Sequence, residues 1–128
     1  MPGASRALLE GSPQLGVTAP AQTSIGDTAA LAASANPARK GLIVQNTGTT
    51  IIKLTLGGTN PSQTVYHIAL AAATVADNGS GATYIDDNWV GEVRVISSVA
   101  GGTFFLTEIS TGSPNWDRAM DLGLESVL

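Results

Sequence analysis

Residues 41–56, which read Gly-Leu-Ile-Val-Gln-Asn-Thr-Gly-Thr-Thr-Ile-Ile-Lys-Leu-Thr-Leu, hold the strongest structural signal in the chain. In the second half, Ile52, Leu54 and Leu56 fall on one side of an extended chain and the residues between them on the other. A period of two over this length predicts a strand with one buried face. The first half is a β-branched run, and the Asn and Gly of residues 46–49 tolerate positive φ. These residues therefore predict two strands joined by a tight hairpin.

The rest of the chain repeats this pattern at short spacing. Further alternating or β-branched segments occur at residues 64–70, 83–85, 89–97 and 103–109. Gly-, Asn- and Pro-rich turns separate them, and residues 71–82 are expected to form a loop. No strand–helix–strand pattern is present, which excludes the nucleotide-binding α/β folds. About six or seven short strands predict an all-β fold, a small antiparallel β-sandwich or barrel-like module.

The two ends of the chain differ in composition from this central β-sandwich domain, which we place at residues 29–112. Residues 1–28 hold three prolines and few large apolar groups, so burial offsets little of the cost of ordering them. We expect an extended N-terminal arm there, ordered only against a partner, or alternatively a dispensable leader. Residues 113–128 begin with Ser-Pro, a helix-start signal, and are expected to form a short amphipathic C-terminal helix.

The apolar residues of this C-terminal tail recur every four positions, which places them in one stripe on a helix. They are Trp116, Met120, Leu124 and Leu128. The stripe predicts docking on a neighbouring subunit, and packing on the chain's own sandwich remains an equal alternative.

Charge and composition limit the possible partners. The chain has 128 residues, six of them basic and ten acidic, with a net charge of −4. So few cations cannot form the phosphate-binding stripe that nucleic-acid affinity requires, so we expect no nucleic-acid partner. The most apolar run, residues 68–73, is too short to span a bilayer, and we expect no membrane partner and no secretory signal. Only 12% of residues are charged, which favours a surface covered in an oligomer or lattice, although an Ala-rich free surface is the alternative.

Residues that carry chemistry are scarce. There is no cysteine, and His67 is the single histidine, so neither a catalytic triad nor a Cys- or His-based metal site can be built. Residues 77–80 and 86–88 offer oxygen ligands of the kind that calcium takes, but without the spacing of a helix-loop-helix calcium site. Asp and Asn are also common in turns. We expect a non-enzymatic protein with no catalytic, cofactor-binding or metal-binding residues.

Three stretches carry a resemblance to a known type of protein: residues 36–49, 89–97 and 101–109. They read Asn-Pro-Ala-Arg-Lys-Gly-Leu-Ile-Val-Gln-Asn-Thr-Gly-Thr, Trp-Val-Gly-Glu-Val-Arg-Val-Ile-Ser and Gly-Gly-Thr-Phe-Phe-Leu-Thr-Glu-Ile. The chain resembles small β-rich phage virion proteins of the capsid decoration (cement) or head-fibre-base type. The resemblance implies a protein that is made in the host cytoplasm and bound to the outside of the capsid. There it would often form a homotrimer that braces major capsid protein subunits.

Two other roles remain open from the sequence, a receptor- or carbohydrate-recognition module and a tail or connector protein of the same particle. For recognition, Trp89 beside residues 86–88 is the best candidate, although Trp89 is more readily explained as the start of a core-facing strand.

The candidate interface residues in the sandwich follow from their positions. Arg39 and Lys40 precede the first strong strand and are candidates to meet an acidic capsid surface, or are ordinary solubilising charges. His67 is expected at the surface or in an interface. Phe104 and Phe105 fall on opposite faces of the last strand, so we expect one face on the core and the other, with Phe105, on a neighbouring subunit or the arm.

Overall fold

The computed structural model describes residues 15–111, and residues 1–14 and 112–128 lie outside the description. The predicted all-β class is confirmed: the described residues form strands and no helix. In chain order the strands are β1 (Leu15–Val17), β2 (Gln22–Ile25), β3 (Ala30–Ala33), β4 (Arg39–Asn46), β5 (Ile52–Leu56), β6 (Ile68–Leu70), β7 (Thr83–Asp86), β8 (Val93–Ser97) and β9 (Gly102–Thr111). The C-terminal helix predicted at residues 113–128 lies outside the described residues.

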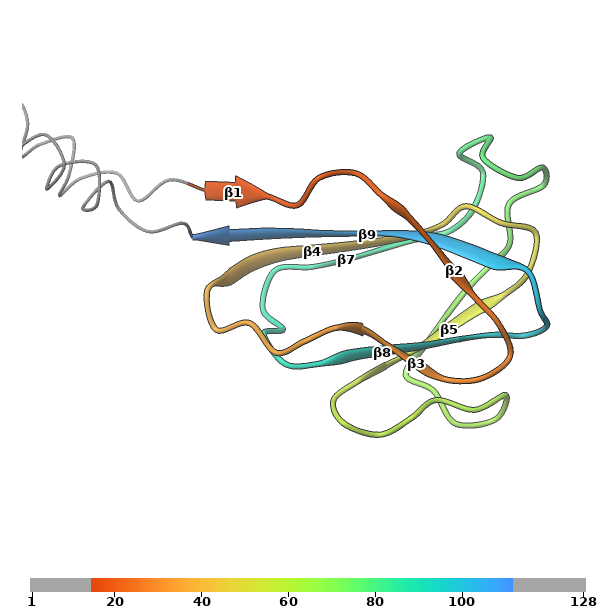
Figure 1. Cartoon of the computed structure of the whole chain (residues 1–128), viewed down its shortest axis with the longest axis horizontal. Helices are drawn as coiled ribbons and strands as arrows, with labels where there is room; N and C mark the ends of the chain where they lie inside the picture. The colour runs from red at the N-terminus through yellow and green to blue at the C-terminus, as the bar shows by residue number, and fades with distance from the viewer. Residues whose placement is uncertain (1–14, 112–128) are drawn as a thin grey trace, which may run out of the picture.

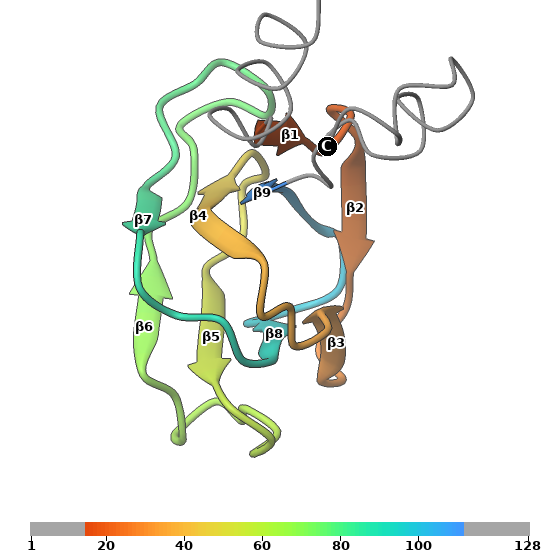
Figure 2. The same ribbon diagram turned by 90° about the vertical axis from the view of Figure 1, so that its left-hand side faces the viewer.

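The strands form two antiparallel sheets that face each other as a sandwich. Sheet A has the order β1-β9-β4-β7, with β2 also paired to β9, and sheet B has the order β3-β8-β5-β6. Figure 1 shows β9, β4 and β7 in one layer and β8, β3 and β5 in the other, and Figure 2 shows the same layers from the end. The sandwich predicted from strand spacing is therefore the fold of the described residues.

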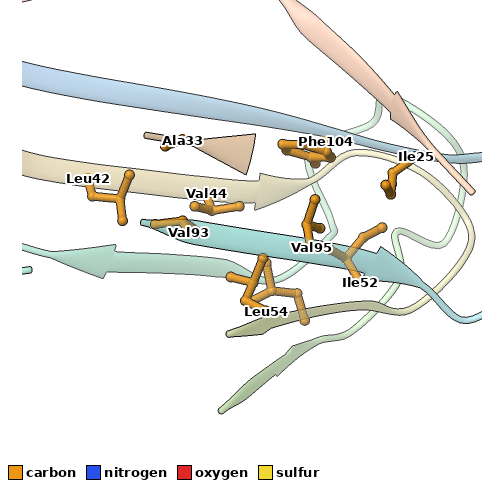
Figure 3. Close-up of a cluster of buried hydrophobic side chains, with 10 residues drawn as sticks. Ile25, Ala33, Leu42, Val44, Ile52, Leu54, Val93, Val95 and Phe104 are labelled. Atoms are coloured by element: carbon orange, nitrogen blue, oxygen red, sulfur yellow. The ribbon is translucent and has the colours of Figure 1, made fainter. Parts of the chain in front are cut away.

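The core lies between the two sheets and follows the period-two pattern of the sequence. Ile52 and Leu54 are fully buried, as their alternation predicts, and Leu56 is partly buried against them. Both sheets contribute inward side chains, which Figure 3 shows meeting in one cluster. Its buried members are Ile25, Ala33, Leu42, Val44, Ile52, Leu54, Leu70, Val93, Val95 and Phe104.

The hairpin predicted at residues 46–49 is wrong, because the connection crosses from one sheet to the other. β4 belongs to sheet A and β5 to sheet B, so they face each other across the core and do not pair. Asn46 holds this crossing: its buried side-chain amide donates to the carbonyls of Thr50 at 2.7 Å and Leu70 at 3.0 Å. Its Oδ1 atom accepts from the amide of Gly48 at 3.1 Å. The Asn-Thr-Gly-Thr sequence makes a tight turn of either kind, and the local signal does not distinguish them.

The N-terminal arm predicted at residues 1–28 is wrong for its last part, because residues 15–25 contribute two strands to sheet A. β2 pairs with residues 102–105 of β9, and β1 pairs with residues 109–111. Side-chain burial does not predict these strands, because they bury only Ile25. Their gain is in the backbone, because they satisfy the N–H and C=O groups along an edge of β9 that would otherwise be unpaired.

The strand predicted at residues 64–70 is shorter than expected, and only Ile68–Leu70 pairs, with β5. Residues 57–67 instead form a segment that lies over the outer side of sheet B. Arg94 Nη1 on β8 donates to Asn60 Oδ1 at 2.8 Å, and Gln63 Nε2 donates to the carbonyl of Ser97 at 2.9 Å. Between these two anchors Ile96 is 5% exposed, although it points away from the core.

Candidate interaction surface

The register of sheet A brings side chains from five strands onto one outward face. Because Leu42, Val44 and Phe104 point into the core, their neighbours in the alternation point outward. Across the sheet, Ile85 on β7 pairs with Ile43 on β4, which pairs with Thr107 on β9. We call this set the outer face of sheet A. Its paired positions are Leu15, Val17, Gln22, Ser24, Gly41, Ile43, Gln45, Thr83, Ile85, Thr103, Phe105, Thr107, Ile109 and Thr111.

No charged side chain occupies any of these paired positions in the described part of the chain. Three of the apolar residues stand well into solvent, Ile85 at 70% exposure, Val17 at 63% and Leu15 at 62%. Ile43, Phe105 and Ile109 are half-buried among them. The solvent-facing side of an antiparallel sheet normally alternates polar and charged residues with the core residues. An uncharged sheet face with exposed apolar groups is instead typical of an interaction surface.

The other outer face of the sandwich is covered by the chain itself. Residues 57–67 lie over sheet B, and Lys53 Nζ donates to the carbonyl of Gln63 at 2.7 Å while packing 5.0 Å from the centre of the Tyr66 ring. Thr55, which also points outward from sheet B, is 1% exposed and donates to the carbonyl of Thr59. Sheet B thus has an internal cover that carries its charges. On sheet A, Ile85, Val17 and Leu15 stay exposed among residues 15–111, and the Asp77 carboxylate borders the face, where it accepts from Gln22 Nε2 at 2.8 Å.

Phe105 is the predicted interface residue that lies on this face. Its neighbour Phe104 is 2% exposed in the core, so the expected placement of the two rings on opposite faces is confirmed. Phe105 sits between Gln45 on β4 and Gln22 on β2, so residues 22–25 cover part of it. That a further subunit covers the rest stays a prediction.

The prediction of Arg39 as an interface residue is wrong, because its side chain is only 1% exposed. Its guanidinium donates to Glu108 Oε1 from Nε at 2.8 Å and from Nη2 at 2.6 Å. The same group donates to the carbonyls of Ser34, Trp89 and Gly91 at 2.9–3.1 Å. A fork of fixed donors joins three chain segments here. Arg39 therefore holds the fold together and has no face free for a partner.

Of the remaining predicted interface residues, the two that the structure describes, Lys40 and His67, lie at different sheets. Lys40 is exposed in the bulge at the start of β4 and stays a candidate contact. His67 is exposed at the other sheet, where its Nδ1 accepts from the amide of Leu56 at 2.9 Å. Residues Trp116, Met120, Leu124 and Leu128 lie outside the described residues.

The acidic residues considered as calcium ligands serve in turns. Asp86 Oδ1 accepts from the amides of Asn88 at 2.7 Å and Trp89 at 2.8 Å, and its Oδ2 accepts from the Tyr84 hydroxyl. The Tyr84 bond, then the two amides, hold the pKa of Asp86 below its usual value. Burial, followed by this carboxylate neighbour, raises the pKa of Tyr84 to about 12. Within residues 15–111, no three His, Cys, Asp or Glu side chains are placed to share a metal ion.

Ile43, Ile85, Leu15 and Val17 belong to the candidate surface but are not predicted from the sequence. A weak signal was present, since Leu42, Ile43 and Val44 are apolar in succession and so supply both sides of β4. What joins the four residues is the pairing of β7, β4, β9 and β1, which are far apart in the chain.

Comparison with known proteins adds little to this picture. No family model matches the chain, and no curated protein matches it. Among solved structures, the chain is similar to one described as "Bacillus endospore appendages form a novel family of disulfide-linked pili". The TM-score is 0.46 and the identity 20%, over 80% of this chain and 93% of that one. At that TM-score the likeness carries no inference about function, and the present sequence has no cysteine to form a disulfide.

The described residues also contain no helix long and apolar enough to cross a bilayer.

Proposed function

We propose that this chain is a non-catalytic structural subunit that attaches to neighbouring protein subunits, and that it serves as a decoration protein on the outside of a phage head. In that role it braces contacts between major capsid subunits. The resemblance of residues 36–49, 89–97 and 101–109 to virion proteins supports the phage assignment, and these stretches include β4, β8 and β9 of the sandwich.

The observation that carries the proposal is the uncharged outer face of sheet A. A free monomer gains solubility from charges spread over its whole surface. This molecule has no charged residue at the paired positions of the face and leaves Ile85, Val17 and Leu15 exposed on it. A neighbouring subunit that covers this face removes apolar area from water at about 25 cal/mol per Å².

The recognition role has less support, because it depended on an exposed Trp89. That indole is partly buried against the core, and its Nε1 donates to the carbonyl of Glu92 at 2.9 Å. A ring held in this way is not presented for stacking on a sugar. Trp89 therefore contributes to the packing of the sandwich.

The test compares particles that carry the wild-type chain with particles that carry Ile85→Lys. A lysine at this 70% exposed position is harmless to the free chain, but an interface would have to bury its charge. We expect occupancy on the particle to fall about tenfold or more, and the heat stability of the particle to fall with it. Val65→Lys is the matched control, because Val65 is 52% exposed in the segment over sheet B. A chain absent from purified particles, or equal occupancy for all three proteins, would refute the proposal.

A further inference from the structure

The uncharged outer face of sheet A has a border at which the chain leaves the described structure. The last residue of β9, Thr111, pairs with Leu15, the first residue of β1. Thr111 and Leu15 are both paired positions of the outer face. Leu15 and the nearby Val17 are among the most exposed apolar groups of that face. Residues 112–128 therefore begin at the border of this face. Seventeen residues follow from that point.

The sequence of these residues supplies the complementary chemistry. Four of their six large apolar side chains, at positions 116, 120, 124 and 128, recur every four residues, whereas Leu122 and Val127 fall outside this series; the charged side chains are at 117, 118, 121 and 125. In a helix this spacing gives one apolar stripe with the charges on the other sides. A helix from 116 to 128 is about 20 Å long, and a ten-residue strand such as β9 is about 33 Å long. An uncharged stripe of that length fits within an uncharged face of this size.

The connection after β9 favours a face on another molecule. A proline disfavours the α region at the residue before it, so the sequence leaves Gly112 as the main position for a reversal directly after Thr111. A segment that is to lie back on its own sheet needs such a reversal. Short hinge connections under strain invite the exchange of an element between identical copies. The sequence after β9 therefore favours a second copy over the chain's own sheet.

We propose that residues 113–128 of one copy bind the outer face of sheet A of a second copy. This rests on the proposed function, in which that face contacts a neighbouring subunit, and it states which subunit the neighbour is. Contact between two outer faces of sheet A alone would bury too little area for a stable interface. Four strands at about 4.8 Å spacing and up to about 33 Å long give a footprint of roughly 500 Å², below the roughly 800 Å² per partner of a standard interface. When two copies exchange residues 113–128, the exchanged segments bury additional area and so make up this difference. The exchange also joins the two copies before they bind a particle.

The experiment uses the full-length chain and measures its mass in solution by sedimentation over a range of concentrations. Two variants each break one side of the contact: Thr107→Glu on the face and Met120→Lys in the segment. We expect the wild type to associate, and each variant alone to need at least about tenfold higher concentration, because a charge would be buried without a partner. The melting temperature of each variant should stay that of the wild-type monomer, and Val65→Lys should associate as the wild type does.

Mixing the two variants identifies the occupant. Met120→Lys keeps an intact face and Thr107→Glu keeps an intact segment, so the mixture should regain association that neither variant shows alone. A wild type that remains a single chain at all concentrations would overturn the inference, as would association that Met120→Lys leaves unchanged. Occupancy on particles is read separately. A monomeric chain whose binding to the particle still depends on Ile85 would leave the proposed function standing and refute only the copy-to-copy contact.

Discussion

The guanidinium of Arg39 is buried in hydrogen bonds within the chain, although the sequence suggests that its charge is free to contact a partner. Its fork joins Glu108 to three backbone carbonyls, and Glu108 lies on β9 two residues from the half-buried Leu106. Breaking a buried ion pair from one side leaves the other charge and the carbonyls without donors. We expect Arg39→Ala to lower the free energy of unfolding by about 3 kcal/mol in urea titration.

Lysine at position 39 should restore little of this loss, because a single ammonium cannot reproduce the planar fork. Lys40→Ala is the control, and as an exposed substitution it should change stability by less than about 0.5 kcal/mol. Equal effects at both positions would contradict the structural role of Arg39.

Asp86 gives the molecule an acid-sensitive turn. Its pKa in the folded chain is lowered, first by the Tyr84 hydroxyl and then by two amides, relative to the usual 3.8. A group with a depressed pKa contributes stability that is fully present above its unfolded pKa and is lost as the pH falls through the folded one. We expect Asp86→Asn to lose less stability than the wild type between pH 5 and pH 2, measured by denaturant unfolding at each pH. Asp87→Asn, at the exposed neighbour, is the matched control in the same assay.

Tyr84 makes the stability of the fold sensitive to alkaline pH. Its pKa is raised to about 12, so its contribution is present below pH 10 and is lost as the pH rises through 12. Tyr84→Phe should flatten this alkaline loss in thermal melts, whereas Tyr66→Phe, at a 44% exposed ring, should not.

At the level of elements, the sequence predicts the strands that bury one side of their residues. It does not predict the strands whose position depends on backbone pairing with a distant strand. β5 and β8 were located because their alternation repeats in the chain, and β4 and β9 because of their β-branched and aromatic runs. β1 and β2 were missed because backbone pairing to β9, more than side-chain burial, orders them. Phe105 was identified on the candidate surface, but the surface itself was not, because it exists only once β7, β4, β9 and β1 lie side by side. Local patterns record alternation and do not record register.

The crossing between the sheets depends on one close approach of two backbones. A Cβ atom added to Gly81 would lie 1.8 Å from the carbonyl oxygen of Asn46, at the end of β4. The neighbouring residue Ala82 accepts from the Asn46 amide at 3.0 Å, so the two segments cannot separate without breaking this bond. We expect Gly81→Ala to destabilise the fold by at least about 2 kcal/mol, as overpacking does. Gly26→Ala, with no atom within 4 Å of the added carbon, is the control in the same unfolding assay.

At the scale of the whole molecule, the few charged side chains of the described residues are unevenly distributed over the sandwich. Lys53 and Arg94 lie on the outer side of sheet B, and Arg39 with Glu108 is turned inward. Asp86 and Asp87 stand at the end of β7. The outer face of sheet A carries no charged residue at its paired positions, and Asp77 stands at its border, where its Oδ1 accepts from Gln22 Nε2 at 2.8 Å. The two sides of the sandwich therefore differ: residues 57–67 cover one, and the other keeps exposed apolar groups, which is the side that we propose a neighbour covers.

This asymmetry sets how attachment to a particle should respond to salt. Charge pairs between exposed groups weaken as the screening length falls from about 10 Å at 0.1 M salt to about 3 Å at 1 M. Apolar contact has no such dependence. If the outer face of sheet A carries the attachment, the fraction of protein that sediments with particles should stay within about twofold between 0.1 and 1 M NaCl. Lys40→Glu, which reverses the exposed cation at the start of β4, should leave that fraction equally unchanged. A loss of about tenfold in both measurements would instead place the contact at Lys40 and an acidic partner surface, because only charge pairing is screened in this way.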